Sequence, residues 1–123
     1  MTDKDFFKKL KIKINKAIMD VYDLAEQFPK SELYGTVSQL KRAVVSIMLN
    51  FVEGFGRRRP KVKLNFFEIS YGSARECKYL IFLAYERKWI NKIQYDQLFS
   101  LLDEISAMIW SMITGLEKQI GND

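Results

Sequence analysis

The stretch from Gln39 to Pro60 constrains the fold more than any other part of the chain. Its apolar residues recur every three or four positions, the spacing of a helix with one buried face, and they are Leu40, Ala43, Val44, Ile47, Phe51 and Phe55. A second stripe is wholly polar and comprises Gln39, Arg42, Ser46, Asn50, Glu53 and Arg57. Gly54 and Gly56 weaken the helix and Pro60 ends it. The helix therefore leads into a turn with five cations: Arg57, Arg58, Arg59, Lys61 and Lys63.

Few residues interrupt helices elsewhere in the chain. The 123 residues, of which 48% are hydrophobic, include only two prolines and six glycines, so we expect one globular domain built from long helices. Apolar periodicity predicts helices at about 5–27, 32–56, 61–87 and 92–119. Short connections between long helices predict an all-α, up-down-up-down antiparallel four-helix bundle.

Capping residues set the expected helix starts. Ser31 could cap a second helix that begins at Glu32. Alternatively, Thr36 could cap it, with Gln39 completing a capping box. Asn91 is the expected cap of the last helix.

The third expected helix is apolar around nearly its whole circumference. Neighbouring helices in a chain this small cannot cover all of it, so the remainder predicts a subunit interface. Trp110 lies off the core stripe of the last helix and is a second candidate for that interface. Gly72, Ser73 and Ala74 form a small-residue patch where another backbone could approach closely.

The predicted topology brings two basic segments to one end of the bundle. Lysines near the N-terminus join the cations that follow the second helix, and the expected nucleic-acid contacts are Lys8, Lys9, Lys11, Lys13, Arg57, Arg58, Arg59, Lys61 and Lys63. The formal net charge of +5 favours an anionic partner only weakly. A solvated lysine face, an acidic protein or an anionic membrane surface would explain the same cations. Phe6, Tyr34 and Phe55 could stack on bases or pack in the core or an interface.

Catalytic and metal-binding patterns are missing from the sequence. There is no histidine, and the single cysteine, Cys77, is expected to be a small core residue. Glu53, Glu68 and Glu76 could form carboxylate pairs, but the di-iron pattern of helical bundles also needs histidine. We expect Glu53 and Glu76 to pair with Arg42, Arg75 or a helix end. We therefore predict no enzyme, no metal and no cofactor. No signal peptide or long apolar run is present, so we expect a cytoplasmic protein without membrane contact.

One long motif resembles a known family. The run FPKSELYGTVSQLKRAVVSIMLNFVEGFGR, followed by FFEISYGSARE, is similar to the four-helix-bundle proteins encoded by intervening sequences of bacterial 23S ribosomal RNA genes. Met48, Cys77 and Lys78 depart from the family pattern. We interpret its polar and small positions as mainly structural, and they include Gln39, Arg42, Ser46, Asn50, Glu53, Gly54, Gly56, Gly72, Ser73 and Glu76.

The resemblance implies a non-enzymatic homo-oligomer, typically a pentamer. The accessory variability determinants of diversity-generating retroelements look similar, and they are basic pentamers that bind nucleic acid and a reverse transcriptase. The leading hypothesis is therefore an oligomer that binds nucleic acid, RNA in particular, through its basic end. The alternative is a protein-interaction scaffold for a reverse transcriptase or another nucleic-acid enzyme.

Overall fold

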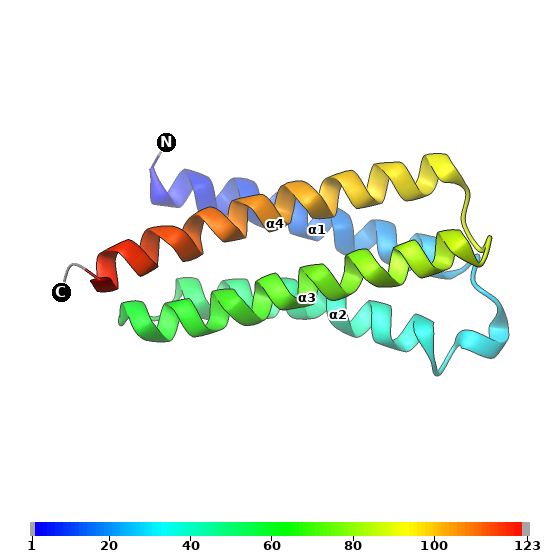
Figure 1. The fold of residues 1–123 in the computed structure, drawn as a ribbon, viewed down its shortest axis with the longest axis horizontal. Coiled ribbons are helices and arrows are strands. Elements are labelled where there is room, and N and C mark those ends of the chain that lie inside the picture. Colours follow the sequence, from blue (N-terminus) through cyan, green and yellow to red (C-terminus); the bar gives the residue numbers. More distant parts are fainter. Residues whose placement is uncertain (1, 122–123) are drawn as a thin grey trace.

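The computed structural model describes residues 2–121, which form four long α-helices and contain no strand. The helices are α1 (Asp3–Ala25), α2 (Thr36–Phe55), α3 (Pro60–Glu86) and α4 (Lys92–Gly121), and a short 3₁₀ turn, η1 (Lys30–Glu32), precedes α2. They run up, down, up and down along one axis (Figure 1), so the predicted all-helical four-helix fold is confirmed.

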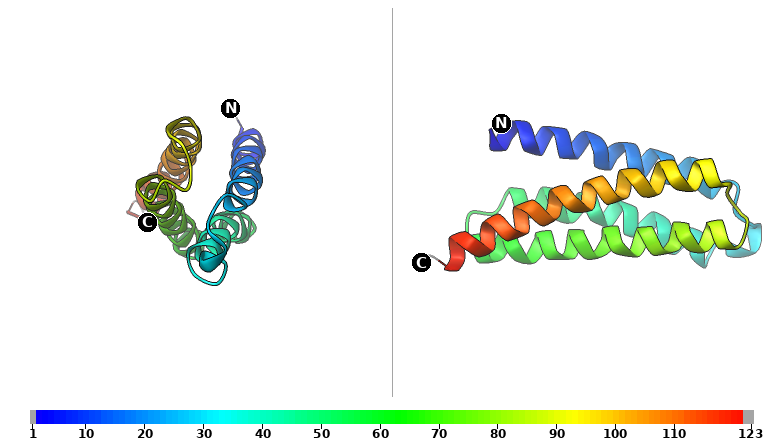
Figure 2. Two further views of the ribbon diagram at one scale, coloured as in Figure 1. Left: turned by 90° about the vertical axis from the view of Figure 1, so that its right-hand side faces the viewer. Right: turned by 45° about the horizontal axis from the view of Figure 1, so that its top comes forward.

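The helices form a four-sided bundle in which each helix lies beside the next one in the chain. α4 also contacts α1, although the end-on view of Figure 2 shows these two helices further apart than the other neighbouring pairs. The start of α1, the α2–α3 turn and the end of α4 all lie at one end of the bundle (Figure 1). The η1 loop and the α3–α4 connection lie at the other end.

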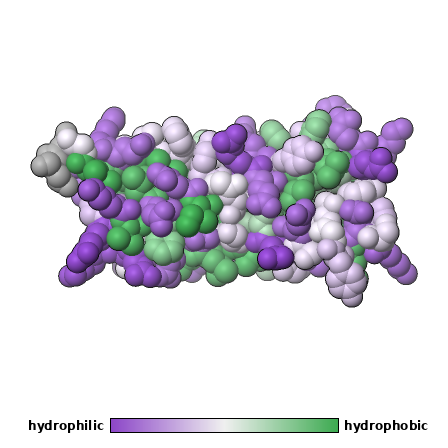
Figure 3. Space-filling model, turned by 60° about the horizontal axis from the view of Figure 1, so that its bottom comes forward, coloured by the Kyte–Doolittle hydropathy of each residue, from purple (hydrophilic) through white to green (hydrophobic). Residues whose placement is uncertain are grey.

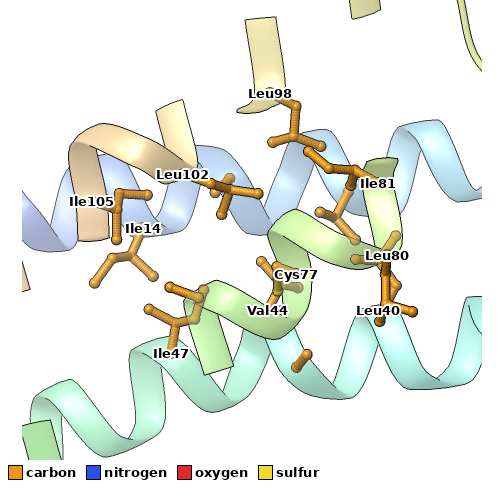
Figure 4. Close-up of a cluster of buried hydrophobic side chains, with 14 of the residues drawn as sticks. Ile14, Leu40, Val44, Ile47, Cys77, Leu80, Ile81, Leu98, Leu102 and Ile105 are labelled. Atoms are coloured by element: carbon orange, nitrogen blue, oxygen red, sulfur yellow. The ribbon is translucent and has the colours of Figure 1, made fainter. Parts of the chain in front are cut away.

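The core follows the apolar stripes expected from the sequence. α1 buries Leu10, Ile14, Ala17 and Val21, and the stripe of α2 from Leu40 to Phe51 is buried against it. Figure 4 shows Ile14, Val44, Cys77 and Leu102 meeting between the four helices. By length and composition α4 could also cross a membrane, but its apolar stripe packs inside this bundle.

The start of α2 differs from both sequence-based interpretations. Ser31 lies within η1 rather than capping a helix, and α2 begins at Thr36, after Gly35. The Thr36 hydroxyl donates to Glu32 Oε1 at 2.6 Å, and the Thr36 backbone N–H points to the same oxygen at 3.4 Å. The Glu32 carboxylate therefore accepts the hydrogen bonds at the first turn of α2. The expected Thr36–Gln39 capping box does not form.

The cap of α4 matches the expectation. Asn91 Oδ1 accepts a bond from the Gln94 N–H at 2.8 Å, and Gln94 Oε1 accepts one from the Asn91 N–H at 2.9 Å. This reciprocal pair is a capping box, which fixes where the last helix begins.

Part of α3 remains uncovered within the single chain. Phe67, Ala74, Cys77 and Ile81 are buried, whereas Ile69, Tyr79 and Phe82 are exposed. Trp110 is also half-exposed, with its ring 5.3 Å from that of Tyr71. The close approach considered for Gly72 does not occur within residues 2–121, because a Cβ at this position would meet nothing within 4 Å.

Candidate nucleic-acid interface

Five of the nine sequence-predicted cations are exposed and make neither an ion pair nor a cation–π contact with any part of residues 2–121. Two lie on the first turns of α1, and three lie in and after the α2–α3 turn; they are Lys8, Lys9, Arg58, Arg59 and Lys61. We call these residues the free basic cluster. Figure 3, which faces α2 and α3, shows hydrophilic side chains projecting at this end of the molecule, with hydrophobic patches between them.

The other sequence-predicted cations already have partners within the chain. Arg57 pairs with Glu53 one turn earlier and lies over the Phe66 ring. Lys13 Nζ lies 2.7 Å from Glu104 Oε1 on α4 and is half-buried. Lys11 lies over the Phe7 ring at 5.7 Å from its centroid. These contacts leave their charges partly compensated.

Lys63 has a structural contact that the sequence did not reveal. Its Nζ donates to the carbonyl of Phe55 at 2.9 Å and lies 3.4 Å from that of Gly54. These carbonyls belong to the last turn of α2, where a cation is favoured by the helix dipole. The half-buried Lys63 therefore ties the start of α3 to the end of α2 and fixes the turn that carries Arg58 and Arg59.

Tight packing also fixes this turn. Gly54 is buried, and a Cβ built on it would lie 2.7 Å from the Phe67 ring and 3.0 Å from Phe66 Cβ. Phe55 packs on Phe7 with ring centroids 4.0 Å apart. The predicted structural role of Gly54 thus rests on close helix contact, whereas the nearest neighbours of a Cβ at Gly56 would lie at an ordinary 3.7 Å.

The aromatic residues considered for base stacking lie in different surroundings. Phe6 and Phe55 line an open cleft of about 420 Å³ at the basic end, together with Phe67, Met112 and Leu116. Tyr34 lies at the opposite end, on the η1 loop. The fold therefore separates Tyr34 from the two phenylalanines, and only the phenylalanines lie near the basic cluster.

The structure places the carboxylates and the thiol that the sequence analysis considered for chemistry. Glu53 pairs with Arg57 rather than with Arg42 or Arg75, and Glu76 makes no ion pair within residues 2–121. Burial, and next the negative charge of Glu76, raise the pKa of the Cys77 thiol to about 12. A thiol held protonated in the core is a poor nucleophile. No group of three or more Cys, Asp or Glu side chains suits a metal ion in the described part of the chain.

The polar motif residues lie along the outer seam between α2 and α3. Ser46 and Ser73 hydroxyls are 2.8 Å apart, and Asn50 Nδ2 donates to the Ser46 hydroxyl and carbonyl oxygens at 3.0 Å. Deeper in the seam, the Ser70 hydroxyl donates to the Ile47 carbonyl at 2.7 Å, a contact that the sequence gave no reason to expect. These small residues let the two helices lie close together, as a structural motif should.

Gln39, Arg42 and Glu76 are exposed motif residues that lie next to one another on the surface. They line an open groove of about 390 Å³ with Ala43, Ser46 and Ser73. None of the three side chains makes a hydrogen bond or an ion pair to the rest of residues 2–121. These three side chains therefore do not stabilise the fold of a single chain through hydrogen bonds or ion pairs.

A comparison with protein families identifies the family of this chain. The model of the family described as 23S rRNA-intervening sequence protein matches residues 4–111. The chain belongs to this family. The match includes residues of all four helices and ends within α4.

A solved structure supports the fold of this family member. It is a protein with unknown function from the S23 ribosomal protein family of Bacteroides thetaiotaomicron, and the TM-score is 0.78 at 21% identity. The alignment covers 85% of this chain and 97% of that one. No curated protein matches the chain. Neither match names a retroelement accessory protein, so that part of the resemblance stays a prediction.

Proposed function

We propose that this 23S rRNA-intervening sequence family protein is a non-enzymatic homo-oligomer that binds RNA through its basic end. The supporting observation is the free basic cluster, whose five side chains are exposed and lack ion-pair partners within residues 2–121. Binding phosphate releases counterions from the nucleic acid, and such contacts carry little sequence information.

The rigid turn favours this use of the cluster. Because Lys63 and Gly54 fix the turn, Arg58 and Arg59 project from a defined backbone rather than from a mobile loop. Asp3 and Asp5 in the first turn of α1 limit the positive potential of one copy. Several copies with parallel basic ends would present a denser cationic rim.

Uncovered apolar side chains support the homo-oligomer. Ile69, Tyr79 and Phe82 on α3 and Trp110 on α4 are exposed in the single chain. Aromatic side chains are enriched at protein interfaces, where their apolar area is removed from water. An assembly that covers part of α3 would bury them.

The test compares two charge reversals of equal size. Variant one changes Arg58, Arg59 and Lys61 to Glu at the basic end; the control changes Lys30, Arg87 and Lys88 to Glu at the other end. Both lower the net charge by the same amount, so a general electrostatic effect would weaken both alike. We expect a steep loss of affinity for a structured RNA in variant one, measured by fluorescence anisotropy at several salt concentrations.

The salt dependence adds a second readout. Each lost phosphate contact lowers the slope of log affinity against log salt by about 0.7–0.9, so the basic-end variant should lose about 2 units of slope. The control should keep the wild-type slope. Equal binding by the wild type and variant one would refute RNA binding at this end and favour the alternative, a scaffold for a reverse transcriptase or another nucleic-acid enzyme.

A further inference from the structure

The loop before α2 holds two large side chains away from the protein. Tyr34 is 93% exposed and Leu33 is 51% exposed. The loop is nevertheless closely held, because the Glu32 carbonyl accepts from the Gly35 N–H at 3.1 Å and the Glu32 carboxylate accepts from the Thr36 hydroxyl at 2.6 Å. Leu33 and Tyr34 therefore form a preorganised projection, which we call the Tyr34 knob.

The open groove between α2 and α3 contains charged side chains that lack partners within the chain. The Ala43 and Ser46 side chains contribute to its lining from α2, while Ser73 and Glu76 contribute from α3. The Arg42 guanidinium and the Glu76 carboxylate have no ion-pair partner within residues 2–121. A fitting occupant would present a flat apolar surface to the guanidinium and a hydrogen-bond donor to the carboxylate.

A tyrosine side chain has both properties. Its ring stacks on a guanidinium, and its phenol O–H donates to a carboxylate. We propose that the Tyr34 knob of one copy binds in the α2–α3 groove of a second copy, between Arg42 and Glu76.

This inference rests on the proposed homo-oligomer and identifies one contact between its copies. The knob and the groove are different patches of one chain. In a ring of more than two copies, each copy therefore offers a knob to one neighbour and a groove to the other. Such contacts close into a ring when the rotation between neighbours allows it. The groove site is incomplete in one chain because its aromatic residue comes from the neighbour.

The first test removes each half of the contact separately. Tyr34→Ala removes the knob and Arg42→Glu places a second acid beside Glu76 in the groove. Truncating an aromatic interface anchor weakens binding by about 30-fold or more, so both variants should dissociate at concentrations where the wild type is assembled. Ile93→Ala is the matched control, because Ile93 is 69% exposed and lies in neither surface. Its mass in light scattering should equal that of the wild type.

The second test mixes the two dissociated variants. The Tyr34→Ala chain retains a groove and the Arg42→Glu chain retains a knob, so together they can form one intact contact and no second one. We expect a 1:1 complex with twice the 14.5 kDa protomer mass and nothing larger. A contact that pairs knob with knob, or groove with groove, would not give this result.

Separate outcomes distinguish the inference from the proposed function. A wild type that stays monomeric at tens of micromolar would overturn both the homo-oligomer and this contact. A wild-type oligomer that survives Tyr34→Ala, or variants that fail to form the mixed complex, would overturn the contact and leave the homo-oligomer standing. Circular dichroism and melting curves establish that each variant is folded, and Tyr34→Phe, which keeps the ring, should restore most of the assembly.

Discussion

Alanine substitutions at Gly54 and Gly72 should change the free energy of unfolding in opposite directions. Both lie inside helices with ordinary helical backbone angles, so in both cases a Cβ gains roughly 0.5–1 kcal/mol from helix propensity. The atoms around each new Cβ then decide whether the substitution stabilises or destabilises the protein. At Gly72 a Cβ meets nothing within 4 Å. Gly72→Ala should therefore raise the free energy of unfolding by about 0.5–1 kcal/mol.

At Gly54 the added methyl group collides with two aromatic residues. The new Cβ would lie 2.7 and 2.8 Å from Phe67 ring atoms and 3.0 Å from Phe66 Cβ. Phe67 is buried and its ring is packed against Phe51, so it cannot swing into solvent. Overpacking of this kind costs about 1–3 kcal/mol, which outweighs the propensity gain. We expect Gly54→Ala to lower the free energy of unfolding by about 1–2 kcal/mol.

Urea denaturation followed by circular dichroism measures both changes at the same protein concentration, because assembly would otherwise shift the midpoint. The two midpoints should move to opposite sides of the wild type. If Gly54→Ala stabilises the protein as much as Gly72→Ala, α2 and α3 are not in close contact at Gly54, and the argument for a rigid basic turn is wrong.

Three further predictions concern the core, the turn and the buried thiol. Ile14→Ala should cost about 2–5 kcal/mol in urea denaturation, whereas Ile12→Ala, at a position 63% exposed on the same helix, should stay within about 0.5 kcal/mol. Lys63→Met should lower the stability by about 1 kcal/mol, and it should weaken RNA binding less than Lys61→Met does, because Lys63 caps α2. The raised pKa of Cys77 disfavours its thiolate in the folded state, so this residue's contribution to stability is present below pH 9 and is lost between pH 9.0 and about 12. At pH 8 a thiol reagent should label Cys77 only as fast as the protein opens, and rapid labelling of the native protein would contradict its burial.

The helices could be predicted from the sequence because their apolar stripes are regular. The α2 stripe was expected to run from Leu40 to Phe55, and its members from Leu40 to Phe51 are buried. The start of α2 could not be predicted because two capping patterns were available in the sequence. The side chain that satisfies the first turn, Glu32, lies before the helix and reaches it only through the geometry of η1.

The surroundings of Gly54 follow from the sequence pattern, whereas those of Gly72 do not. Gly54 lies seven residues after Ile47 and three after Phe51, so it continues the buried stripe, and its close packing could have been inferred. Gly72 lies between the buried positions Ser70 and Ala74 but faces solvent. The role of Lys63 was not accessible in this way, because it depends on how the turn folds back onto the end of α2.

The Tyr34 knob and the free basic cluster lie at opposite ends of the bundle. Assembly and RNA binding can therefore be tested by separate substitutions. The Tyr34 knob lies with η1 at one end, while Arg58 and Arg59 lie at the α2–α3 turn at the other (Figure 1). Tyr34→Ala should therefore leave the basic cluster of each copy intact. If RNA contacts several copies at once, dissociation removes the gain from multivalency, which can exceed about a hundredfold. A Tyr34→Ala protomer that binds a short RNA normally and a long RNA weakly would show that the assembly exists to align basic ends. Equal weakening for both lengths would instead place Tyr34 in direct contact with the RNA.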